Sequence, residues 1–91
     1  MFEWDEDKRR TNIAKHGIDF VEVTRFEFDR ATIERDLRHD YGEPRLIATG
    51  PLGDRVHVLI CVERDGLRII SLRKANARER TRWARAIGSS A

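Results

Sequence analysis

The sequence has few of the residues that mark secreted or metal-binding proteins. Its 91 residues include one cysteine, three histidines and two prolines. One cysteine cannot form a disulfide within the chain, which excludes a domain stapled by internal disulfides. One cysteine and three scattered histidines also give no spacing typical of a metal centre. We therefore expect neither a bound metal nor a cofactor.

Long apolar stretches are lacking as well. No segment approaches the roughly 20 apolar residues that a membrane-spanning helix needs. The acidic start, Met1 to Asp7, is unlike a signal peptide. Internal repeats and a glycine-rich phosphate loop are also missing from the pattern. These features predict one soluble cytoplasmic domain over residues 1–91, with no membrane contact.

Positive charge dominates the last third of the chain. From Arg64 to Arg85 there are eight basic residues against two acidic ones, whereas residues 17–63 carry six basic and ten acidic residues. Such one-sided charge is typical of surfaces that contact phosphates. We expect the final hairpin and the terminal helix to gather these guanidinium groups into one surface that holds a phosphodiester.

Caps, turns and hydrophobic periodicity predict an α+β domain. The expected order is a short strand over 2–4, helices over 6–16 and 19–28, an antiparallel four-stranded meander over 31–37, 45–50, 56–63 and 67–74, and a helix over 80–87 after a capping box that begins at Asn76. The two turns of the meander that flank residues 56–63 are predicted at 51–54 and at Asp65-Gly66. A two-residue loop at Asp65-Gly66 pairs Glu63 with Arg68 and Arg73 with Val58. A one-residue bulge would reverse half of these cross-strand assignments.

Two sets of residues carry a resemblance to a known family. The first is Phe2-Glu3-Trp4-Asp5, Lys8, Asn12, Lys15-His16-Gly17-Ile18 and Phe20; the second is Gly42-Glu43, Arg45, Gly50, Glu63-Arg64, Arg68-Ile69-Ile70-Ser71, Arg73, Ala75 and Glu79-Arg80. In order and spacing the chain resembles the BrnT toxins. The final helix departs from the pattern, with Trp83 where tyrosine is expected. An indole can stack on a base but cannot donate a proton as a phenol can.

The resemblance implies a toxin of a type II toxin–antitoxin system. Such proteins have a RelE-like fold and act as ribonucleases that stop translation. The implied partner is a BrnA-like antitoxin in a 2:2 hetero-oligomer, with operator DNA bound only through the antitoxin. The implied substrate is RNA.

Metal-free RNA cleavage needs a base near the 2′-hydroxyl, cations around the phosphorane and a proton for the departing oxygen. Arg73 is our first candidate for the phosphate, because a guanidinium can bind two phosphate oxygens. The alternative is a structural ion pair between Arg73 and Glu79. Arg64 and Arg80 are further candidates. Strand rise places Arg64 roughly 20–30 Å from Arg73, so the two cannot hold one phosphate.

His16 and Glu63 are the candidates for acid–base chemistry. His16 has an imidazole whose ordinary pKa lies near neutrality, but it also closes a helix, where it can satisfy terminal carbonyls. Glu63 can act as a base or pair with Arg68 across the hairpin. The candidate RNA contacts are Lys8, Lys15, Arg45, Arg68, Lys74 and Trp83.

Two other functions fit the same sequence. One is a catalytically inactive RelE-like protein that serves as antitoxin partner and co-repressor. The other is an unrelated small nucleic-acid-binding domain.

Overall fold

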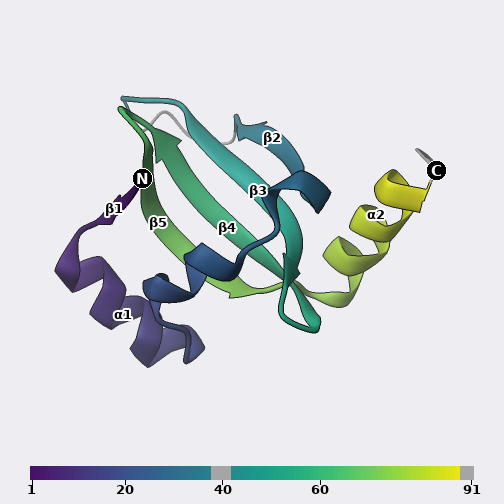
Figure 1. Ribbon diagram of the computed structural model, residues 1–91, viewed down its shortest axis with the longest axis horizontal. Helices are drawn as coiled ribbons and strands as arrows, with labels where there is room; N and C mark the ends of the chain where they lie inside the picture. The colour runs from purple at the N-terminus through teal and green to yellow at the C-terminus, as the bar shows by residue number, and fades with distance from the viewer. Residues whose placement is uncertain (38–41, 89–91) are drawn as a thin grey trace.

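The structure is a computed structural model that describes residues 1–37 and 42–88, and it holds one mixed sheet with a helix at each end (Figure 1). In chain order the elements are β1 (Phe2–Trp4), α1 (Glu6–His16), the 3₁₀ helices η1 (Phe20–Arg25) and η2 (Phe28–Arg30), β2 (Thr32–Asp36), β3 (Arg45–Leu52), β4 (Arg55–Glu63), β5 (Leu67–Lys74) and α2 (Ala77–Gly88). The predicted α+β class is confirmed.

The sheet is larger than predicted. Within the described residues it has five strands in the order β1-β5-β4-β3-β2. β1 joins its edge parallel to β5, with Phe2 opposite Leu67 and Trp4 opposite Ile69. The four antiparallel strands β2 to β5 follow one another as predicted, but the prediction did not include β1 as a fifth, parallel strand of the sheet. The pairing lets Trp4 pack edge-on against Phe20 in the core, with ring centroids 6.0 Å apart.

Helix α1 forms as its capping residues predict. The Asp5 carboxylate accepts the N–H groups of Asp7 and Lys8, which begin the helix. Gly17 ends it with a left-handed φ of 71°, and its N–H donates to the Ile13 carbonyl. The cap positions therefore set the bounds of this helix.

The predicted second helix over 19–28 is a 3₁₀ segment instead. Asp19 caps η1 as expected, and Phe20, Val23 and Phe26 face inward, exposed by 0%, 1% and 5%. The 3₁₀ form ends at Arg25. The β-branched side chains within η1 lower the propensity for an α-helix. Phe26 then forms a bridge to Leu52 in β3.

The last hairpin has a bulge. Arg73 lies opposite Val58 as predicted, but Glu63 lies opposite Leu67 and Val62 opposite Arg68, because Ile70 of β5 has no partner on β4. The predicted Glu63–Arg68 pair was therefore wrong. The extra residue has a physical reason: Ile69 and Leu72 would point to opposite faces of a regular strand, and the bulge buries both completely.

The turn between β3 and β4 is shorter than predicted. Pro51 and Leu52 belong to β3, opposite Val56 and Arg55, and the turn is Gly53-Asp54. Gly53 takes a φ of 67°, which favours glycine. Proline has no N–H to donate to a neighbouring strand, but β2 pairs with β3 only as far as Thr49, so position 51 can hold a proline.

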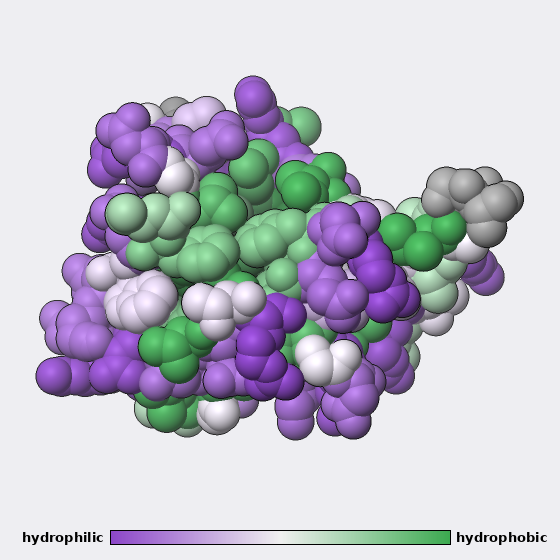
Figure 2. All heavy atoms as spheres, viewed as in Figure 1, coloured by the Kyte–Doolittle hydropathy of each residue, from purple (hydrophilic) through white to green (hydrophobic). Residues whose placement is uncertain are grey.

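The hydrophobic core lies on one face of the sheet. Its buried residues are Phe20, Val23, Phe26, Ala48, Leu52, Leu59, Cys61, Ile69 and Leu72. The 3₁₀ segments cross this face (Figure 1), and Figure 2 shows hydrophobic side chains still visible between hydrophilic borders. Burial raises the pKa of the Cys61 thiol to about 11, so this thiol is unreactive at neutral pH.

Helix α2 leaves the sheet at the end of β5 and projects from the opposite side to α1 (Figure 1). The predicted capping box is present: Asn76 and Glu79 exchange backbone-to-side-chain hydrogen bonds of 2.8 Å. None of its residues is buried. None of the described helices has the length and apolar character needed to cross a membrane.

Candidate functional site

Asn12 fixes α1 against the edge of β5. Its side chain is 5% exposed; the amide donates to the carbonyls of Leu72 (2.8 Å) and Ile18 (3.0 Å), and its oxygen accepts the N–H of Leu72 (3.1 Å). β1 pairs only with residues 67–69 of β5. At Leu72, beyond the end of β1, the Asn12 amide makes the hydrogen bonds that a neighbouring strand would otherwise make. From the sequence, Asn12 was recognised only as part of the family resemblance, and this structural role was not predicted.

The contact creates a polar hollow between α1 and β5. It has a volume of about 360 Å³ and is lined by Asp7, Lys8, Thr11, Asn12, Lys15, His16, Ile70 and Ser71. Three of the predicted site residues, Lys8, Lys15 and His16, therefore lie together. Their helix face is turned toward the same strand that carries Arg73.

His16 lies within the electrostatic reach of Arg73. Partial burial lowers the pKa of its imidazole, and the positive charges of Lys15 and Arg73 lower it further. The ring is therefore neutral at pH 7 and has a nitrogen lone pair that can accept a proton. The carbonyl of Ile13 at this helix end is already bonded to Gly17, so His16 does not serve that carbonyl.

Arg73 makes a two-point ion pair with Glu79. Both nitrogen–oxygen distances are 2.8 Å, and the pair joins β5 to the first turn of α2. These hydrogen bonds and the Asn76 N–H lower the pKa of the Glu79 carboxyl to about 2, against the effect of its burial. The ion pair with Glu79, the structural alternative for Arg73, is thus present in the molecule. A guanidinium has five N–H donors, so Arg73 can bind a phosphate as well as Glu79.

The cations of the last third are divided between separate regions: Arg64 and Arg68 lie away from Arg73, whereas Arg82 lines a groove with it. Arg64 lies at the far end of the β4–β5 hairpin, 3.4 Å from Glu43, and Arg68 lies 3.7 Å from Glu3 on β1. Arg82 on α2 lies 3.8 Å from Glu34 on β2. The expectation of a single guanidinium surface was wrong, because carboxylates distant in sequence meet these arginines in the folded sheet.

The remaining candidates are also spread over the molecule. Glu63 is exposed beside the hairpin turn, opposite Leu67. Arg45 begins β3 opposite Asp36, while exposed Lys74 ends β5 opposite His57. Arg80 on α2 donates to the Ala75 carbonyl at 3.3 Å. Among the predicted catalytic residues, His16 and Arg73 interact electrostatically although they come from separate elements.

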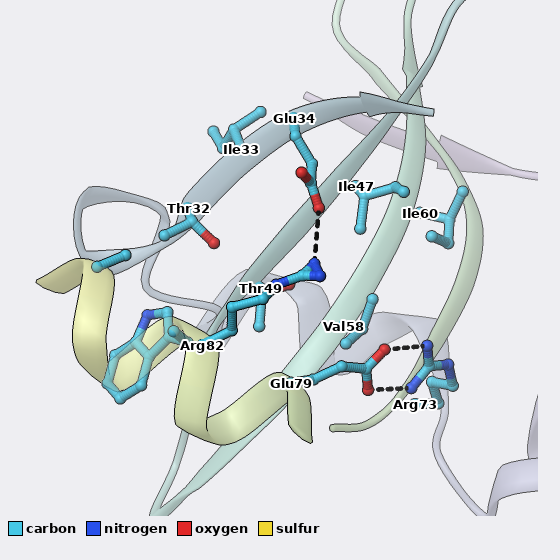
Figure 3. A pocket seen from close by; sticks show the side chains of 12 residues that line it. Thr32, Ile33, Glu34, Ile47, Thr49, Val58, Ile60, Arg73, Glu79 and Arg82 are labelled. Atoms are coloured by element: carbon cyan, nitrogen blue, oxygen red, sulfur yellow. Dashed lines mark hydrogen bonds and ion pairs between the residues drawn. The ribbon is translucent and has the colours of Figure 1, made fainter. Parts of the chain in front are cut away.

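A groove of about 470 Å³ lies between α2 and the sheet face opposite the core. Figure 3 shows Ile47, Val58 and Ile60 pointing into it from the strands, with the Arg73–Glu79 and Arg82–Glu34 pairs beside them. Trp83 lines the groove, and its indole N–H donates to the Arg30 carbonyl at 2.8 Å. No local pattern predicts this groove, because its walls come from five separate elements, β2, β3, β4, β5 and α2.

Comparison with known proteins identifies the family. The family model for the ribonuclease toxin BrnT of type II toxin–antitoxin systems matches residues 4–79. The chain belongs to the BrnT family. The crystal structure of the BrnT ribonuclease toxin from Brucella abortus is similar to it, with 34% sequence identity and a TM-score of 0.67 over 84% of this chain and 97% of that one. Among curated proteins no match is found.

Membership in the BrnT family makes the chain a toxin of a type II toxin–antitoxin system. The matched residues include the α1–β5 hollow, Arg73 and Glu79. They end before Arg80 and Trp83, so the family match carries no argument about those two residues.

The acidic and metal-binding side chains do not converge in the described ranges. Within residues 1–37 and 42–88, no three His, Cys, Asp or Glu side chains are grouped as a metal site would require. His16 lies within the electrostatic reach of two cations, Lys15 and Arg73.

Proposed function

We propose that this BrnT-family toxin is an endoribonuclease that cleaves RNA without a metal ion at the junction of α1 and β5. One observation supports this more than any other: the hydrogen bonds between Asn12 and Leu72 hold α1, which ends at His16, against β5 at the residue next to Arg73. A neutral imidazole within the electrostatic reach of a guanidinium supplies a base and a cation for one phosphodiester. The ribonuclease description of the family supports the same reaction.

In this proposal His16 accepts the proton of a ribose 2′-hydroxyl. The 2′-oxygen attacks phosphorus, the bond from phosphorus to the 5′-oxygen breaks, and the 5′-oxygen takes a proton from solvent. Arg73 stabilises the charge that develops on the phosphorane oxygens. Lys8 and Lys15, exposed on the same face of α1, attract the RNA backbone. Arg64 and Glu63 are left out, because they lie at the other end of the hairpin.

The partner in this proposal is a BrnA-like antitoxin. The type II family implies an antitoxin. The proposal further includes a 2:2 hetero-oligomer that binds operator DNA through the antitoxin. It also includes translation arrest by the free toxin and a cytoplasmic location. The proposed fold type is RelE-like. An inactive co-repressor is the second candidate, because Glu79 already engages Arg73 and tryptophan stands at position 83.

The first prediction tests cleavage directly. Purified protein incubated with RNA in excess EDTA should cut it, and Arg73→Ala should lower the rate by about 10²–10³-fold, as loss of one oxyanion donor does. His16→Ala should lower it comparably. Arg10→Ala, an exposed arginine on α1 outside the hollow, is the matched control and should cleave as the parent does.

The outcomes separate the two candidates. Cleavage that EDTA abolishes would contradict the metal-free mechanism. No cleavage by the parent protein, with growth arrest also missing on expression without the adjacent gene, would favour the inactive co-repressor.

A further inference from the structure

Helix α2 carries an apolar side that the sheet covers incompletely. The helix is amphipathic, yet none of its residues is buried. Trp83 and Ala86 line the groove together with Ile47, Val58 and Ile60 of the sheet. An apolar groove left open in this way is typical of a surface that a partner covers.

The charges of the groove cancel. It contains two arginines and two glutamates in pairs, Arg73 with Glu79 and Arg82 with Glu34. RNA would bring its phosphates against both carboxylates and over the side chains of Ile47, Val58 and Ile60, which offer no hydrogen bonds. Sites for single-stranded RNA combine cations with aromatic platforms, but here both arginines are paired with glutamates and the Trp83 N–H is bonded to the Arg30 carbonyl. This groove therefore suits a peptide better than a polyanion.

The outer side of α2 adds positive charge. Arg78, Arg82 and Arg85 follow helical spacing and line a shallow hollow with Ala77 and Thr81. Arg82 lines both this hollow and the groove, so the two surfaces are continuous. Within the described residues neither Arg78 nor Arg85 forms an ion pair. An apolar floor beside a cationic stripe is complementary to an acidic amphipathic segment.

We infer that this groove is the docking site of the antitoxin. The occupant is an amphipathic segment whose apolar side chains, at i, i+3 or i+4 spacing, fill the groove above Ile47, Val58 and Ile60. Its acidic residues meet the arginine stripe. Arg73 lines the groove, so a docked segment also covers the residue assigned to the phosphate. This inference rests on the proposed function, because the toxin–antitoxin pair supplies the occupant.

The experiment uses two matched pairs of variants. Ile47→Glu and Val21→Glu each place a carboxylate on an aliphatic position that is not fully buried, but only Ile47 lines the groove. Arg82→Glu and Arg10→Glu each reverse a charge on a helix, and only Arg82 lines the groove. The probe is the purified product of the open reading frame adjacent to the toxin gene, titrated calorimetrically into each toxin variant.

Ile47→Glu and Arg82→Glu should each weaken binding at least tenfold, while Val21→Glu and Arg10→Glu stay within twofold of the parent. Free Ile47→Glu and Arg82→Glu should still cleave RNA at the parent rate, which shows that both are folded. Equal binding by all four variants would overturn the inference. Loss of cleavage with intact partner binding would also overturn it and assign the groove to RNA. Failure of the proposed function looks different: the parent itself neither binds the product nor cuts RNA.

Discussion

His16 owes its proposed role to two neighbouring cations. Lys15 follows the same helix, and Arg73 comes from β5, and both lower the pKa of the imidazole below its ordinary value of 6.5, as burial does. A base with a lowered pKa remains deprotonated over a wider acidic range. Activity that depends on neutral His16 therefore persists to lower pH than an unperturbed histidine would allow.

The second prediction follows from Lys15. Lys15→Ala removes one of the cations that lower the pKa of His16, so this pKa rises. The acid limb of the pH–rate profile should then shift to higher pH, and the cleavage rate above neutrality should change less. The measurement is cleavage of one RNA from pH 4.5 to 8.5, with Arg10→Ala as control. A purely structural His16 predicts no shift. An acid limb that stays at the same pH in Lys15→Ala would therefore remove His16 from the chemistry.

At the scale of elements, the joint between α1 and β5 depends on one amide. Asn12 satisfies both backbone groups of Leu72, a residue that is completely buried. A buried donor or acceptor without a partner costs about 1–3 kcal/mol. The third prediction is that Asn12→Ala lowers the free energy of unfolding by about 2–4 kcal/mol.

Urea unfolding followed by circular dichroism measures this loss. Thr11→Ala, the exposed neighbour on α1, is the control and should stay within about 0.5 kcal/mol of the parent. A comparable effect of the two variants would mean that the Asn12 amide is not the joint between α1 and β5.

These elements also show what the sequence could predict. Asp5, Gly17 and the Asn76–Glu79 box act on their immediate neighbours, so the bounds of α1 and the start of α2 were within reach. The partner of β1 lies more than 60 residues further along the chain, and no local pattern specifies it. The bulge at Ile70 arises because Ile69 and Leu72 both pack into the core, a tertiary requirement.

At the scale of the whole molecule, charge pairing overrides charge clustering. The basic last third suggested one cationic surface, but Glu3, Glu34 and Glu43 come from the rest of the chain to meet Arg68, Arg82 and Arg64. Composition reports how many cations there are, and only the sheet order decides which carboxylates face them. The candidate site was thus predictable as residue types, with His16 and Arg73 among them, while its location required the fold.

The fourth prediction concerns the attachment of α2 to the sheet through Glu79. The folded-state pKa of this carboxyl is about 2, below the ordinary value of 4.5. A lowered carboxyl pKa contributes stability that is fully present above pH 4.5 and is lost as the pH falls through about 2. Glu79→Gln keeps a side-chain oxygen for the capping box but loses the charge that holds Arg73. It should lower the free energy of unfolding at pH 7 by about 1–3 kcal/mol.

Urea unfolding of both proteins from pH 7 to pH 2 tests the sign as well as the size. The difference between parent and Glu79→Gln should be constant at neutral pH, shrink below pH 4.5 and nearly vanish near pH 2. Glu3→Gln is the control, because its 3.7 Å pair with Arg68 is half exposed and contributes little. A difference that persists undiminished at pH 2 would mean that Glu79 supports α2 by packing alone. Helix α2, which forms one wall of the groove, would then be held in place without Arg73. Binding of an antitoxin in the groove would not require the Arg73–Glu79 pair.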